Sequence, residues 1–156
     1  MSVLTGIRAA LVVLTIAGAA GCTAEKDRLD AEVRRLCALD GGIKVYEKVG
    51  LPPERFDKYG SVTVPDRRLA KPTDEYFTES KHDVLVKGNP ELWRSHTALI
   101  RQRDHKVLAE SVHYWRRGGD LPGPWQPSVF TCPELSGIGR SVFFKVDASS
   151  EKERTK

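Results

Sequence analysis

The sequence predicts an α+β fold, in which an N-terminal helix packs on a small antiparallel sheet that contains a long hairpin. Apolar residues first recur with helical spacing, and stretches with the alternation of strands follow them. A length of 156 residues, 40% of them hydrophobic and 29% charged, suits one globular domain. We therefore expect a signal segment over residues 1–21, a single domain over residues 22–147, and a flexible polar tail over residues 148–156.

The helix is predicted over Glu25–Leu39. Its apolar stripe is formed by residues that recur on one helical face, namely Leu29, Val33, Leu36 and Cys37. The following Asp40-Gly41-Gly42 ends the helix, because glycine readily adopts the left-handed conformation that follows a helix. The stripe places Cys37 on the packed face of the helix.

Strands of unequal strength follow the helix. Ile43–Val49 alternates like a strand and is stopped by Leu51-Pro52-Pro53, and Glu54–Tyr59 is a candidate for one short turn of helix. Two weaker segments and one stronger segment come next, namely Ser61–Pro65, Glu75–Glu79 and Asp83–Lys87. The last two strands are expected near Val129–Cys132 and Val142–Val146, with a loop over Ser136–Arg140.

The clearest pattern is a pair of long strands, Glu91–Arg103 and Lys106–Arg116, separated by Asp104-His105. If those two residues form a tight turn, Arg103 faces Lys106 and His96 faces His113 across the hairpin. Two facing imidazoles could bind a transition metal, but no third ligand lies on their face, so we predict no metal site.

The first 21 residues have the features of a secretory signal. Met1–Arg8 is short and ends in a positive charge, and Ala9–Ala20 is apolar and carries no charge. Twelve apolar residues are too few to cross a bilayer comfortably as a mature helix. We therefore expect export from the cytoplasm.

Ala19-Ala20-Gly21-Cys22 resembles the lipobox of bacterial lipoproteins. The resemblance implies that the thiol of Cys22 receives a diacylglycerol and that a dedicated peptidase cleaves before it. Ala19 departs from the leucine that is favoured at that place, so ordinary cleavage at Ala17–Ala19 and an uncleaved anchor remain alternatives. Thr23, where such proteins of the inner membrane tend to have aspartate, implies the periplasmic side of the outer membrane.

Cys37 and Cys132 remain once Cys22 is acylated. Exported domains occupy compartments in which disulfides persist, so we expect these two cysteines to pair. The alternative is a pair of buried free thiols that pack as small apolar side chains.

Two further stretches resemble a group of small proteobacterial lipoproteins without assigned function. They are Cys37–Tyr46 and the run Val107–Asp120 with Pro127–Pro133. The resemblance implies a family and a cellular location but no activity, and it agrees with pairing of the two cysteines.

Arg116 and Arg117 are the best candidate for an anion contact, since two guanidinium groups beside Gly118-Gly119 could bind a phosphate or carboxylate. We find no catalytic motif and expect no cofactor. The three tryptophans are assigned to the core or its rim rather than to a sugar platform. The net charge is +4, but the basic residues are interspersed with acidic ones along the chain. Nucleic acid is therefore not an expected partner.

These observations predict a lipid-anchored protein of the cell envelope that faces the periplasm as a binding or structural module. Its partners would be the membrane, through the lipid on Cys22, and another envelope protein. The alternative is an envelope hydrolase acting on peptidoglycan or lipid, which would need a nucleophile or a perturbed carboxylate in a cleft.

Overall fold

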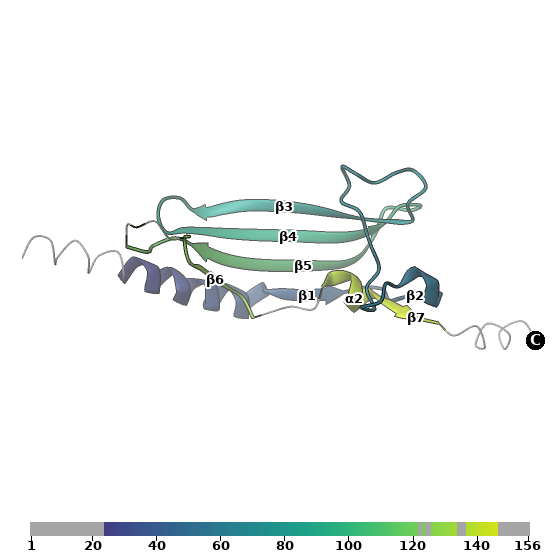
Figure 1. The fold of residues 1–156 in the computed structure, drawn as a ribbon, viewed down its shortest axis with the longest axis horizontal. Helices are drawn as coiled ribbons and strands as arrows, with labels where there is room; N and C mark the ends of the chain where they lie inside the picture. Colours follow the sequence, from purple (N-terminus) through teal and green to yellow (C-terminus); the bar gives the residue numbers. More distant parts are fainter. Residues whose placement is uncertain (1–23, 122, 124–125, 134–136, 147–156) are drawn as a thin grey trace, which may run out of the picture.

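A mostly antiparallel sheet forms the centre of the molecule, and the predicted α+β class is confirmed (Figure 1). The computed structural model describes residues 24–121, 123, 126–133 and 137–146. The predicted signal segment, Cys22 and the polar tail lie outside these residues. Neighbouring strands of the central sheet follow the order β1 (Gly42–Val45), β5 (Lys106–Arg117), β4 (Glu91–Arg101) and β3 (Tyr76–Val86), and β6 (Val129–Thr131) also pairs with β5.

A second, two-stranded sheet joins distant parts of the chain. Its strands are β2 (Val49–Leu51) and β7 (Phe143–Lys145), which run parallel. The strand predicted over Ile43–Val49 is therefore divided between two sheets. The division falls where the amides of Tyr46 and Glu47 both donate to the carbonyl of Leu108. A short 3-10 helix, η1 (Pro53–Arg55), follows β2.

The predicted loop over Ser136–Arg140 is wrong for its second half, where helix α2 (Ile138–Val142) begins. This helix has only five residues, too few for an apolar stripe to repeat, so periodicity could not reveal it. Val142 is 1% exposed and anchors α2 in the hydrophobic core.

The N-terminal helix covers residues 24–40 and lies beside β6 and β1 in Figure 1. The predicted stripe is the packed face, since Leu29 and Val33 are fully buried. They form a hydrophobic cluster with Leu92 of β4, Tyr114 of β5 and Cys132. These strand residues share one face of the sheet, because Leu92 pairs with Arg116 and Arg94 pairs with Tyr114.

The other hydrophobic cluster lies toward the β4–β5 turn. Leu99, Leu108 and Ala109 are fully buried there against residues of β2, β7 and α2, namely Leu51, Phe143 and Val142. Leu99 pairs with Ala109, and Ala109 pairs with Val45 of β1. These pairs lie on the sheet face opposite Tyr114, so the two clusters cover different faces at different ends of the sheet.

The predicted register of the hairpin is wrong. The strands end at Arg101 and Lys106, so the connection has four residues instead of two, with His105 at a φ of 53°. A bulge at Leu108 then shifts the pairing once more. His96 consequently pairs with Val112, and His113 pairs with Ser95, so the two imidazoles lie on opposite faces.

β3 is one continuous strand, whereas the sequence predicts separate strands at Glu75–Glu79 and Asp83–Lys87. Its polar middle does not break the strand, because β3 is at the edge of the sheet and those side chains are exposed. The strand predicted at Ser61–Pro65 is also wrong. That segment approaches β3 only at its end, where Asp66 bridges to Thr78.

A disulfide and a buried ion pair connect the helix to the sheet. The structure joins Cys37 to Cys132 in a disulfide with its Cα atoms 5.7 Å apart, the pair that the sequence predicts. Closer to the helix start, Nε of Arg116 donates to Oδ1 of Asp30 at 2.7 Å. Nη1 of the same guanidinium donates to the carbonyls of Gly118 and Ser128. Arg116 is 2% exposed, so these partners replace the water that an exposed guanidinium would contact.

Replacing Arg116 with methionine should lower the free energy of unfolding by about 3–5 kcal/mol, because Asp30 would lose its partner in a mostly buried site. Arg117→Met is the matched control: Arg117 is exposed, and the change should stay within about 0.5 kcal/mol. Urea unfolding curves of both variants measure the difference. Equal losses would show that the buried pair contributes nothing specific.

Candidate functional site

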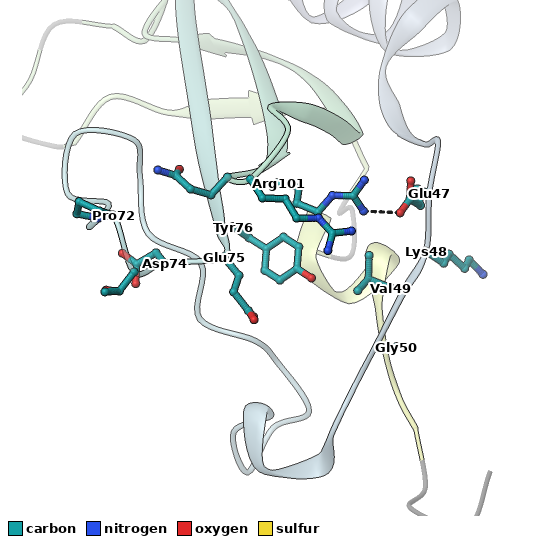
Figure 2. A pocket seen from close by; sticks show the side chains of 12 residues that line it. Glu47, Lys48, Val49, Gly50, Pro72, Asp74, Glu75, Tyr76 and Arg101 are labelled. Atoms are coloured by element: carbon teal, nitrogen blue, oxygen red, sulfur yellow. Dashed lines mark hydrogen bonds and ion pairs between the residues drawn. The ribbon is translucent and has the colours of Figure 1, made fainter. Parts of the chain in front are cut away.

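A cleft of about 570 Å³ lies between β2, the loop before β3 and the β4–β5 turn. Figure 2 shows Tyr76 between Glu75 and Val49, with Arg101 and Glu47 along the wall and Asp74 on the other side. This volume is within the usual range for sites that bind small molecules. The elements around it are held by the second hydrophobic cluster, in which Tyr76 meets Phe143 edge to face at 4.9 Å.

Arg101 organises one wall of the cleft. Its Nη1 donates to Glu47 at 2.6 Å, and its Nη2 donates to Asp104 at 2.7 Å (Figure 2 for the first contact). Lys106 also pairs with Glu47, at 2.6 Å. The hydrogen bond from Arg101 lowers the pKa of Asp104 to about 2. Hydrogen bonds from Lys106 and Arg101 lower the pKa of Glu47 as well, so both carboxyl groups are ionised at neutral pH.

Polar groups without a partner among the described residues remain in the cleft. The amide of Val146 donates to the carbonyl of Leu51, so the parallel pattern turns the N–H and C=O of Gly50 away from β7. Burial raises the pKa of Tyr76, which keeps its hydroxyl protonated as a donor. Arg103 is exposed at the rim, whereas Glu75 is paired with Arg55 at 2.8 Å. Such a set can bind a polar ligand through donors and acceptors.

The cleft gives no sign of hydrolytic chemistry. Its lining has a threonine and a tyrosine as hydroxyl groups, and no histidine is among the lining residues. Each carboxylate with a lowered pKa near the cleft is held by a cation rather than placed in an apolar setting. Burial of that kind would be needed to make a carboxyl group a proton donor at neutral pH.

The candidate anion contact at Arg116 and Arg117 is divided by the sheet. Arg116 points inward, and its donors are taken by Asp30, Gly118 and Ser128, while Arg117 is exposed at the end of β5. The two guanidinium groups alternate in direction along the strand, so they do not converge on one anion. We propose no anion site there.

The histidines of the hairpin have separate environments. Nε2 of His96 lies 3.2 Å from Glu110, which also accepts a hydrogen bond from the hydroxyl of Tyr46. His113 lies on the other face beside Thr131, and burial lowers its pKa. In the part of the chain that the structure describes, no group of three or more potential ligands could hold a metal ion.

Sequence reasoning missed the residues of the cleft. Glu47, Tyr76 and Arg101 are far apart in the chain and come together only through the pairing of β3 with β4 and the division between β1 and β2. The clearest available signal was Arg101 close to the turn residue Asp104, which we interpreted only as a residue within the predicted strand Glu91–Arg103.

Comparisons with known proteins add no assignment. No protein-family model matches the chain, and no curated protein and no solved structure matches it. Among the described residues, no helix has both the length and the apolar character needed to cross a membrane.

The pKa of Asp104 provides a test of the cleft wall. Arg101→Met should raise it from about 2 toward the ordinary value of 3.8, because the guanidinium is its main hydrogen-bond donor. Asp104 stabilises the fold while it is ionised, so this contribution is complete above pH 3.8 and is lost as the pH falls through about 2. Carboxyl NMR titration measures the pKa of Asp104 in the unaltered chain and in the Arg101→Met variant. The lowered pKa of Asp66, which depends on Arg68, should not change, and an unmoved Asp104 would contradict the assignment.

Proposed function

We propose that this chain is a lipid-anchored protein of the cell envelope whose domain faces the periplasm as a binding module. The observation that carries the proposal is the uncharged apolar run Ala9–Ala20, whose last two residues begin the lipobox-like Ala19-Ala20-Gly21-Cys22. Acylation at Cys22 would attach two or more lipid chains, which hold a protein on a membrane stably where one chain would not. With Thr23 after the cysteine, the proposed location is the outer membrane.

The cysteine pair supports the proposed compartment. Cys37 and Cys132 are separated by 95 positions in the chain, so their disulfide closes a long loop. A bridge over a loop of this size stabilises a domain by about 4–5 kcal/mol in the chain-entropy model. Disulfides of this structural kind belong mostly to exported proteins, because cytoplasmic thiols are kept reduced.

The cleft supports a binding role for the domain. Gly50, Tyr76 and Arg103 provide donors and acceptors that the described chain does not use, beside a wall fixed by Arg101. A small polar ligand or an exposed segment of another envelope protein could pair with them. No observation on the described residues favours the envelope hydrolase, so we do not propose it.

Replacing Cys22 with serine should abolish labelling by radioactive palmitate and release the protein from membranes, because the acceptor thiol is lost. Labelling in growing cells, followed by fractionation, measures both effects. A variant with Cys37→Ser and Cys132→Ser is the control, since it should keep its label. Persistent labelling of the Cys22→Ser variant would refute the lipid anchor.

Removing residues 2–21 should leave the chain in the cytoplasm with Cys37 and Cys132 reduced. Alkylation of intact cells with a mass-tagged thiol reagent, followed by peptide mass spectrometry, distinguishes the two redox states. The complete chain should give the joined Cys37–Cys132 peptides under the same conditions. An unchanged disulfide in the shortened chain would argue that the bridge needs no export.

A further inference from the structure

One area of the central sheet has no charged side chain. It lies on the face opposite the N-terminal helix, and we call it the indole face. Its members are Ser80 and His82 of β3, Trp93, Ser95 and Thr97 of β4, Ser111, His113 and Trp115 of β5, and Thr131 of β6.

The strand register makes these residues neighbours. Trp93 pairs with Trp115, Ser95 with His113, and Thr97 with Ser111, and the rows are extended by partners on β3 and β6, namely His82, Ser80 and Thr131. On the same strands the helix-side face has Lys81, Asp83, Arg94, Glu110 and Arg116. Over this stretch of the sheet, charge is thus confined to the helix-side face, in a chain of which 29% is charged. The indole face ends where Arg101 and Arg117 begin.

Three aromatic rings gather around Trp115. The indole of Trp93 is parallel to it within 5° at 6.0 Å, and His82 and His113 each lie 6.1 Å away. Neither hydrophobic cluster includes these residues. The Nε1 donor of Trp93 is buried and has no acceptor among the residues that the structure describes. Core packing therefore does not account for the ring group.

Hydroxyl and imidazole groups surround the rings. The hydroxyls of Ser80 and Thr97 lie 2.9 Å apart, and the hydroxyl of Thr131 bonds to Nε2 of His113. Ser80, His82 and Thr131 are exposed. Because burial lowers the pKa of His113, its ring adds hydrogen-bonding capacity without charge at neutral pH. The face thus brings partly exposed aromatic rings together with hydroxyl and imidazole hydrogen-bonding groups.

The size of the indole face excludes a second protein as its sole occupant. With the usual strand spacing and rise, it measures roughly 14 Å by 14 Å, or about 200 Å². A stable protein interface covers about 800 Å² on each partner, roughly four times as much. A small ligand that is several rings long fits this area.

The chemistry of the face selects the ligand. Nucleic acids and anionic lipid surfaces need lysine and arginine, which are absent from it. A neutral saccharide presents C–H faces that pack on indole rings, and its hydroxyls exchange hydrogen bonds with serine, threonine and histidine. We propose that the indole face binds a short stretch of an uncharged glycan. This binding does not depend on the lipid anchor or on the cleft.

The test uses the full chain, purified in a detergent that has no sugar headgroup. Chitotetraose and maltotetraose are the probes, and tryptophan fluorescence and calorimetry are the readouts. At least one probe should bind and shift the emission. His82→Glu and Thr131→Glu, which add charge from opposite sides of the face, should each abolish binding. Lys81→Glu is the matched control, because it adds the same side chain next to His82 on the other sheet face.

Each result of these binding measurements either supports or overturns the proposed glycan site. Binding that is lost in both glutamate variants and kept in Lys81→Glu supports the proposal. Failure of both tetrasaccharides to bind the unaltered chain overturns it, and so does an equal loss in Lys81→Glu. Circular dichroism checks that the variants fold, and all three substitutions are at exposed positions. Either result leaves the palmitate experiment on Cys22 unaffected.

Discussion

The structure depends on how the N-terminal helix is held against the sheet. The guanidinium of Arg116 is buried, so its charge is compatible with the fold only while Asp30 and the carbonyls of Gly118 and Ser128 surround it. A disulfide fixes the helix again near its other end, at Cys37. Val33 of the helical stripe is buried between these two points, and Leu29 is buried beside Asp30. Helix, β5 and β6 are therefore one unit, from which the other strands extend.

The two faces of the sheet differ in the residues that they expose, because each face is covered at only one end. The helix covers one face, where charged residues such as Arg94 and Glu110 pair with nearby groups. The small β2–β7 sheet and α2 cover the opposite face near the β4–β5 turn. The polar cleft forms at the border of this second cluster, and the uncharged indole face is the remainder. Two chemically distinct surfaces thus follow from incomplete coverage of one sheet.

Local sequence patterns predicted the helix and the long strands well, but they predicted the pairing of the strands poorly. The spacing of Leu29 and Val33 gave the helix, and alternation gave the long hairpin, because each signal comes from neighbours in the chain. The register failed, since a four-residue turn and a bulge at Leu108 leave no clear mark in the sequence. That error also hid the stack of Trp93 on Trp115. The cleft was beyond prediction because its walls meet only through tertiary pairing.

The position of the disulfide has a mechanical consequence. Tension applied from residues before 24 would enter at the start of the helix, where Lys26 is bonded to Asp120. Noncovalent contacts alone would let such a force peel the helix away turn by turn. Because Cys37 is covalently joined to the residue after β6, such peeling would stop at Cys37, and the force would then pass into strands whose hydrogen bonds share it along their length. The domain is thereby suited to resist a pull on its own N-terminus.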